Sequence, residues 1–135
     1  MKPIQTIVET VLYVDDLDAT VAFYRDLLGF PLHQLEPERH VFFRVGDTML
    51  LAFLPDATEQ GGALPPHGAR GEGHVAFGIA DEEREPWREK LIAAGIGIEL
   101  DYTWPRGGKS LYFRDPSGNL VELVTPGVWG LPSGW

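Results

Sequence analysis

Residues 8–14 (VETVLYV) and residues 73–79 (GHVAFGI) carry the same strand-like pattern 65 positions apart. The shift places Glu9 on His74, so each apolar run holds one polar side chain at the same point. The amphipathic stretches that follow the two copies match as well, over 17–29 and 82–95. Two diverged copies within one chain are a stronger signal than any single short motif.

The later parts of the repeat align with a slightly larger shift. A shift of 70 lays residues 42–44 (FFR) on 112–114 (YFR), and after one inserted turn residue 50–51 falls on 121–122. Each half is therefore predicted to run strand, helix, then three strands. Within a single domain of 135 residues, we expect a first module over about 5–56, a linker over 57–72, a second module over about 73–126 and an apolar tail over 127–135.

Periodicity and turn residues place the individual elements. The predicted strands span about 6–14, 31–36, 40–46, 48–54, 73–80, 97–103, 110–114 and 120–125. The first helix is expected to begin at Asp15 or Asp16 and to end at Gly29, with an apolar stripe of Leu17, Val21, Tyr24 and Leu28. The second helix is expected to have Pro86 in its first turn and Gly95 at its end, with Trp87, Leu91 and Ile92 facing the core.

Composition excludes several classes of function. The chain has a net charge of −9 and no cysteine, which argues against nucleic acid or an anionic membrane as a partner and excludes disulfides and thiolate sites. No apolar run approaches the ~20 residues that span a bilayer, and no signal peptide opens the chain. The expectation is a cytoplasmic protein.

Three side chains are candidate metal ligands: Glu9, His74 and Glu122. Each lies in an apolar strand-like run, where a buried carboxylate must be paired or bound to a metal. Because strand side chains alternate between two faces, all three can point away from the helices into a shared concavity. Such a set of nitrogen and oxygen donors suits a divalent metal. Taken singly, Glu9 could be a solvent-facing residue and His74 a satisfied core histidine.

Four motifs together resemble the vicinal oxygen chelate superfamily of glyoxalase I, fosfomycin-resistance thiol transferases, bleomycin-binding proteins and extradiol dioxygenases. In chain order they are 14–17 (VDDL), 23–30 (FYRDLLGF), 73–77 (GHVAF) and 112–123 (YFRDPSGNLVEL). The resemblance implies an α+β fold of two βαβββ modules, the glyoxalase/bleomycin-resistance fold. Each module would be a curved mixed sheet whose concave face houses a divalent metal. It also implies a homodimer, as in many members, with sites built from both subunits.

The resemblance also implies roles for single residues. Glu9 occupies the first-strand ligand position of the family, and His74 and Glu122 match the two ligands of the second module. The fourth ligand of glyoxalase I would fall near Leu51, which cannot coordinate, so a site with three protein ligands is expected. One His and two Glu make a hard, anionic site that suits Mn²⁺, Mg²⁺, Zn²⁺ or Ni²⁺ better than O₂-activating Fe²⁺.

The first functional expectation is a metal-dependent, glyoxalase-like lyase or isomerase. Its metal would hold a small oxygenated metabolite through two neighbouring oxygens, and Glu122 or Glu9 would be the general base. The candidates for lining the substrate pocket are His40, Arg44, Trp104, Ser110 and Tyr112. Fosfomycin transfer is disfavoured, because Tyr102 and Leu131 stand where those enzymes carry cationic groups.

Two other functions stay open at this point. One is a non-catalytic protein of the bleomycin-resistance type, in which acidic, Trp-rich walls sequester a small molecule. The other is an extradiol-type dioxygenase. The tail over 126–135 has no charged side chain and carries two Trp and one Leu. Because a disordered terminus is usually polar, we expect this tail to dock, either across the mouth of the pocket or on a partner subunit.

Overall fold

The computed structural model describes all residues, 1–135. Its contacts divide the chain into two compact units, Met1–Gly71 and Glu72–Trp135. The units share one architecture, and each is described by itself below. None of the helices combines the length and the apolar character that crossing a lipid bilayer requires.

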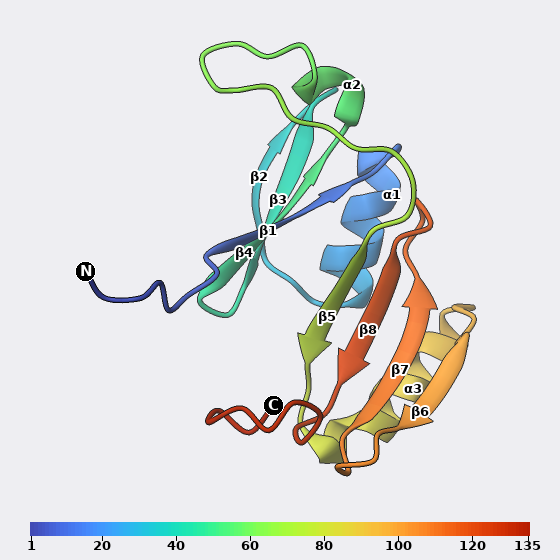
Figure 1. Cartoon of the computed structure of the whole chain (residues 1–135). Helices are drawn as coiled ribbons and strands as arrows, with labels where there is room; N and C mark the ends of the chain where they lie inside the picture. The colour runs from blue at the N-terminus through green and yellow to red at the C-terminus, as the bar shows by residue number, and fades with distance from the viewer. The chain divides into compact units, whose positions relative to one another are not determined.

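The first unit is a four-stranded mixed sheet with a helix on one face (Figure 1). Its strands are β1 (Glu9–Tyr13), β2 (Leu32–Glu36), β3 (His40–Val45) and β4 (Thr48–Phe53). They are ordered β1-β4-β3-β2, with β1 parallel to β4 and the other pairs antiparallel. The crossover from β1 consists of α1 (Leu17–Val21) and a π-helical turn, η1 (Ala22–Leu27).

The second unit repeats this topology. Its strands are β5 (His74–Gly78), β6 (Leu100–Thr103), β7 (Lys109–Arg114) and β8 (Leu120–Val124). They are ordered β5-β8-β7-β6, with β5 parallel to β8. A short 3₁₀ turn, η2 (Asp81–Glu83), and α3 (Arg84–Ala93) form the crossover. All eight predicted strands are present, and the predicted fold of two βαβββ modules is confirmed.

Local sequence explains where the crossover helices begin and end. Asp16 caps α1 by accepting a hydrogen bond from the backbone N–H of Ala19 at 2.9 Å. After η1 the chain reverses at Gly29, whose φ of +85° lies in the left-handed region. The second crossover ends in the same way at Gly95, with φ +77°. The predicted caps and stops are therefore confirmed.

One prediction for the second helix is wrong. Leu91 is fully buried, but Ile92 is 52% exposed. Successive residues of an α-helix point about 100° apart, and the sheet covers only the stripe that contains Leu91. The structure also contains a short helix that was not predicted, α2 (Pro55–Thr58), which crosses the expected boundary between the first module and the linker and has Pro55 in its first turn, where proline is tolerated.

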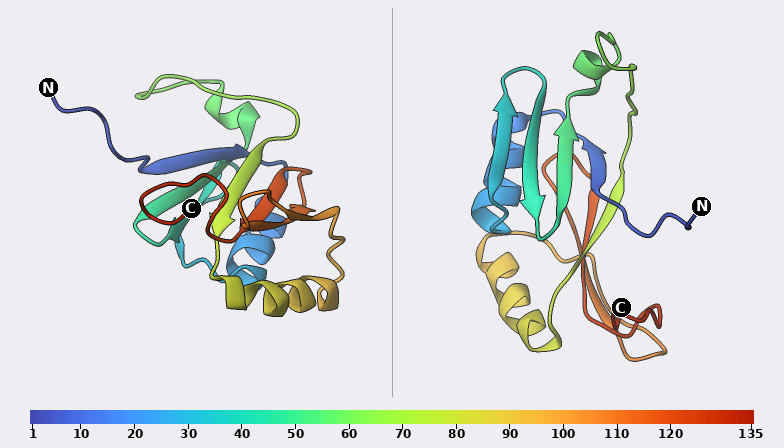
Figure 2. Two further views of the ribbon diagram at one scale, coloured as in Figure 1. Left: turned by 60° about the horizontal axis from the view of Figure 1, so that its bottom comes forward. Right: turned by 90° about the vertical axis from the view of Figure 1, so that its left-hand side faces the viewer.

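Strand alternation separates a core face from an open face in each sheet. In β5 and β8 the core side chains are Phe77, Val121 and Leu123, all buried. The opposite face carries His74, Ala76 and Gly78 from β5, and Glu122 from β8. Figure 2 shows α3 on one face of this sheet and the segment 126–135 on the other. The helix α3 thus covers the core face and not the face with the polar candidates.

A buried polar turn fixes the register of β8. The Oδ1 atom of Asp115 accepts from the backbone N–H groups of Ser117 and Asn119, at 2.9 and 2.8 Å. The Asn119 amide donates to the other Asp115 oxygen at 3.0 Å, and its Oδ1 accepts from the Gly73 N–H at 2.7 Å. Asn119 therefore ties the turn before β8 to the residue before β5, which sets His74 beside Leu120.

Candidate metal centre

His74 and Glu122 meet on the open face of the second sheet. The Nε2 atom of His74 lies 3.4 Å from Oε2 of Glu122. Nδ1 of His74 lies 3.0 Å from the carbonyl oxygen of Leu120. Because a carbonyl oxygen only accepts, this hydrogen bond places the ring proton on Nδ1 and leaves the lone pair of a neutral imidazole on Nε2. A backbone contact of this kind is the usual orienting partner of a metal-binding histidine.

The carboxylate of Glu122 is buried, with 7% of the residue exposed. Its Oε1 atom accepts a hydrogen bond from the hydroxyl of Ser110, a buried residue of β7. The Ser110 oxygen accepts in turn from the indole N–H of Trp104 at 2.8 Å. These two linked hydrogen bonds orient Oε1 of Glu122 and leave Oε2 facing His74. Ser110, predicted to line the pocket, therefore holds the Glu122 carboxylate by a hydrogen bond, and Trp104 holds Ser110 in turn.

Tyr112 stands directly across from Glu122 in the pairing of β7 with β8. Burial raises the pKa of its phenol, and the nearby Glu122 carboxylate raises it further by charge and by hydrogen bonding. Its ring lies 6.3 Å from the His74 ring, measured between centroids. Tyr112 thus lies beside the pair with the pKa of its phenol raised, and its role in a substrate pocket stays a prediction.

The third candidate ligand, Glu9, belongs to the first unit. It is exposed on β1, where it pairs with Met49 of β4. The second unit itself brings no third His, Asp or Glu close enough to complete a metal site with His74 and Glu122. Two of the three predicted ligands therefore converge within one unit.

The strand registers locate the position of a fourth ligand. In the second unit Ala76 pairs with Glu122, two residues beyond the pairing of His74 with Leu120. In the first unit Val11 pairs with Leu51, two residues beyond the pairing of Glu9 with Met49. Leu51 thus takes the place in the first module that Glu122 takes in the second. Leucine has no donor atom, so the matching positions of the two modules offer three candidate ligands.

The geometry of the pair fits a divalent metal. Two ligands bonded at 2.0–2.2 Å in tetrahedral geometry lie about 3.3–3.6 Å apart, and the 3.4 Å between Nε2 and Oε2 agrees with this spacing. The donor atoms are an imidazole nitrogen with its proton on the far side of the ring and a carboxylate oxygen held by a second hydrogen bond. The residues present therefore suit Zn²⁺ or Mn²⁺.

The other two predicted pocket residues lie in the first unit. Arg44 is exposed on β3, and its Nε donates to the carbonyl of Gly46 at 2.9 Å. His40 is buried and stacks on Phe42, with ring centroids 4.0 Å apart. It lines a cavity of about 700 Å³ between β3, β4 and the segment 58–67. Burial lowers the pKa of His40, against an opposing effect of Glu36.

Sequence reasoning missed two features of the second unit. The carbonyl of Leu120 that orients His74 is a backbone group and leaves no mark in the side-chain pattern. The second is the approach of Trp135 to Gly78, which lies on the same face as His74. A glycine in the middle of an apolar strand is the signal that could have indicated a close approach there.

Comparison with known proteins agrees with this architecture. A crystal structure of lactoylglutathione lyase from Agrobacterium tumefaciens is 42% identical, with a TM-score of 0.91, and the match covers 96% of this chain and 99% of that one. Glutathione transferase FosA of Serratia marcescens is 31% identical over 123 residues, 89% of this chain and 80% of that protein. A probable lactoylglutathione lyase of Vibrio parahaemolyticus is 26% identical over 87% of this chain and 88% of that protein.

These relatives are enzymes, which confirms the prediction of an enzyme. Residues 6–123 match the family model described as the Glyoxalase/Bleomycin resistance protein/Dioxygenase superfamily. The match spans both modules and includes Glu9, His74 and Glu122. The chain therefore belongs to the Glyoxalase/Bleomycin resistance protein/Dioxygenase superfamily.

Proposed function

We propose that this protein is a divalent-metal-dependent lyase or isomerase of the glyoxalase type. It would act on a small oxygenated metabolite held through two neighbouring oxygens. The observation that carries the proposal is the pair of His74 and Glu122, whose facing atoms lie 3.4 Å apart while their other polar atoms are engaged by Leu120 and Ser110. Glu9 would be the third ligand.

A bound metal would supply Lewis acidity toward the two substrate oxygens, and three protein ligands would leave coordination positions open for them. His74 and Glu122 would hold that metal in a fixed orientation because Leu120 and Ser110 restrict their rotation. Tyr112 keeps its proton across the physiological pH range and would donate a hydrogen bond to a substrate oxygen that gains negative charge.

The carboxylate for proton transfer would be that of Glu9. One oxygen of Glu122 accepts from Ser110 and the other faces His74, so both are occupied. Glu9 is exposed, whereas Glu122 is buried. In an isomerisation it would take a proton from one substrate carbon and return it to the neighbouring carbon, with no net change in charge.

The names of the relatives suggest a thiol conjugate as substrate. Glutathione occurs in the name of the transferase of Serratia marcescens and of the lyases of Agrobacterium tumefaciens and Vibrio parahaemolyticus. We therefore propose the adduct of a small thiol with an α-ketoaldehyde as the substrate class. Such an adduct presents a hydroxyl and a carbonyl oxygen on neighbouring carbons.

Transfer of a thiol to a phosphonate is the less favoured activity, although FosA is among the relatives. Tyr102 and Leu131 replace the expected cations and are 40% and 51% exposed. Arg114, on the same face of β7 as Tyr112, is already paired with Glu99 and Glu72. This face of β7 therefore offers no unpaired cation that could replace those that would bind a phosphonate.

The test is a parallel assay of the purified protein with two substrate mixtures. One contains glutathione with methylglyoxal, and formation of the thioester is followed; the other contains glutathione with fosfomycin, and loss of free thiol is followed. We expect isomerisation that chelator abolishes and Mn²⁺ or Zn²⁺ restores. Thiol transfer without isomerisation would contradict the proposal, and so would isomerisation that chelator leaves unchanged. Binding of both mixtures without turnover would favour a sequestering protein.

A further inference from the structure

The segment 126–135 folds back on the second sheet beside the candidate metal centre. It is closed on itself by hydrogen bonds, from the Gly127 N–H to the Gly134 carbonyl at 2.7 Å and from the Leu131 N–H to the Trp135 carbonyl at 2.8 Å. Its base is fixed by Thr125, which exchanges backbone and hydroxyl hydrogen bonds with Lys109. The segment is therefore an ordered loop, and not the extended strand that its composition alone would allow.

Two glycines let the loop approach the sheet. A Cβ atom on Gly78 would lie 2.3 Å from the indole ring of Trp135. A Cβ atom on Gly108 would lie 2.4 Å from the side chain of Val128 and 2.9 Å from its backbone nitrogen. All three distances are shorter than real Cβ contacts, so the loop packs against the sheet only because these positions lack side chains.

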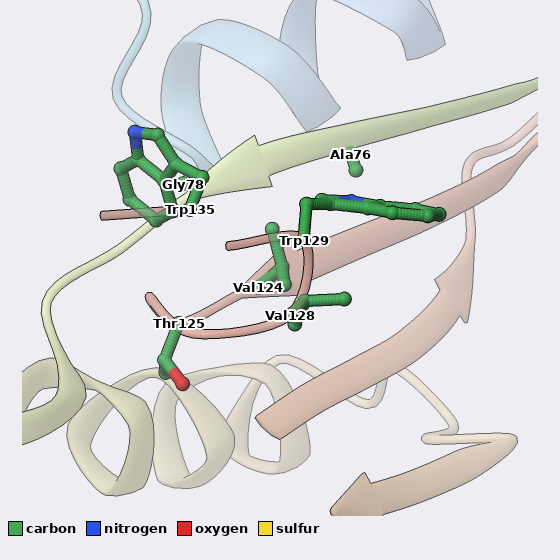
Figure 3. A pocket seen from close by; sticks show the side chains of 7 residues that line it. All are labelled: Ala76, Gly78, Val124, Thr125, Val128, Trp129 and Trp135. Atoms are coloured by element: carbon green, nitrogen blue, oxygen red, sulfur yellow. The ribbon is translucent and has the colours of Figure 1, made fainter. Parts of the chain in front are cut away.

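A cavity of about 280 Å³ lies between this loop and the strands β5 and β8. In Figure 3 the Trp129 ring lies next to Ala76 and Trp135 lies next to Gly78, and Val124 also lines the space. Val128 closes a further side, and no charged side chain lines the space. An apolar cavity of about 150 Å³ can hold a benzene molecule, so this cavity has room for one aromatic ring or a branched alkyl group.

The cavity continues the face that carries the metal ligands. Ala76 is the register partner of Glu122 and lies between His74 and Gly78 on β5. Val124 follows Glu122 by two residues and shares its face of β8. A molecule whose oxygens bind at His74 and Glu122 can therefore extend an attached group along the strands into the cavity.

We propose that this cavity is a subsite for an apolar substituent of the substrate, aromatic or branched, with Trp129 and Trp135 as the residues that set its specificity. The inference rests on the proposed function, because the neighbouring site supplies the reacting atoms. The indole rings offer edge and face contacts to an aromatic group. Ala76 and Gly78 lack large side chains, so the strand surface leaves room for that group.

The probes for the test are acetohydroxamate and benzohydroxamate, which share a pair of neighbouring oxygens and differ in a methyl or phenyl group. We would record NMR shifts of the methyl groups of Ala76, Val124 and Val128 with each probe, on the protein as purified and again after chelator. The phenyl compound should shift these methyls in both states. In the metal-loaded protein it should also bind more tightly than the methyl compound by about tenfold, the scale of discrimination in an apolar pocket.

Matched variants test whether the preference for the phenyl compound depends on the packing of the loop against the sheet. Trp135→Ala, Gly78→Ala and Gly108→Ala should each reduce the preference for the phenyl compound to within about threefold of parity. Gly97→Ala is the control, because a Cβ there meets nothing within 4 Å and its φ is not in the left-handed region. This variant should keep the preference.

The experiment distinguishes failure of the subsite proposal from failure of the proposed function. If the phenyl compound shifts no methyl of Ala76, Val124 or Val128, or if the loop variants keep the preference, the subsite proposal is wrong whatever the metal does. If metal strengthens the binding of neither compound, the proposed function fails, and the methyl shifts after chelator still decide whether the cavity takes the ring.

Discussion

His74 and Glu122 face each other across 3.4 Å on neighbouring parallel strands, each held by a second partner that points its ligand atom toward the other. They come from opposite ends of the second module, 48 positions apart in the chain. Their approach depends on the register of β5 with β8, which the turn at Asp115–Asn119 sets.

Asn119→Ala should destabilise the protein by about 2–3 kcal/mol, because it leaves part of the buried Asp115 carboxylate and the Gly73 N–H without partners. The free energy of unfolding in urea measures this loss. Asp47→Ala, at the exposed turn between β3 and β4, is the control and should stay within about 0.5 kcal/mol of the natural protein. Equal stability of both variants would show that the turn does not hold the register.

Ser110→Ala should weaken metal binding by about 10–100-fold, the usual effect of removing a group that orients a ligand. The variant loses the hydrogen bond to Glu122 and leaves the Trp104 N–H unpaired. Titration of the metal-free protein with Zn²⁺ in a competing chelator measures the affinity. Ser133→Ala, at an exposed serine, should bind as the natural protein does, and an unchanged affinity for Ser110→Ala would argue against orientation by Ser110.

His40 makes the stability of the protein depend on pH. Burial lowers its pKa, so in the folded state the ring stays neutral at a pH where the unfolded chain binds a proton. Stability should therefore fall as the pH drops below the unfolded value of about 6.5, by at most about 1.4 kcal/mol per pH unit, until the folded pKa is reached. The loss in unfolding free energy between pH 8 and pH 5.5 should shrink in His40→Phe and persist in His33→Phe. The same loss in both variants would assign the effect to other groups.

A homodimer with shared sites is the next prediction. The segment around β1 exposes Ile7, Val8 and Val11 by 75%, 63% and 38%, and β1 and β5 are edge strands of their sheets. Exposed apolar groups beside an open edge favour association. Light scattering should give twice the chain mass at micromolar concentration, and a monomer would contradict the prediction.

Mixing inactive Glu9→Ala chains with inactive His74→Ala chains tests whether the ligands are shared. If each site takes Glu9 from one subunit and His74 from the other, random exchange restores about a quarter of the sites. If each chain builds its own site, the mixture stays inactive. Mixing each variant with itself is the control.

The repeat in the sequence predicted most of the fold, because strand alternation and glycine stops are local signals. Asp16, Gly29 and Gly95 end their helices as expected. Ile92 was misplaced because a 3.6-residue period does not say how wide a stripe the sheet covers. The short helix α2 was missed, although Pro55 in its first turn was an available signal.

The sequence predicted that His74 and Glu122 share a face, but not the hydrogen bonds around them. The alternation of side chains along a strand predicted that His74 and Glu122 share one face, and the register of β5 with β8 agrees. The hydrogen bond from Trp104 to Ser110 depends on the turn after β6, where the Trp104 N–H binds the Gly108 carbonyl. The loop at Trp135 depends on a glycine far away in the sequence. Contacts of this kind arise from tertiary packing, and a local pattern such as the glycine within β5 can indicate a close approach without naming the residue that makes it.

Elemental analysis tests whether the protein binds a divalent metal through His74, Glu122 and Glu9. The protein purified without chelator should contain about one Mn²⁺, Zn²⁺, Ni²⁺ or Mg²⁺ per chain. His74→Ala and Glu122→Gln should each lower metal affinity by more than about tenfold, while His33→Ala should not. Protein that contains no divalent metal, and whose melting temperature is the same with and without chelator, would contradict the account.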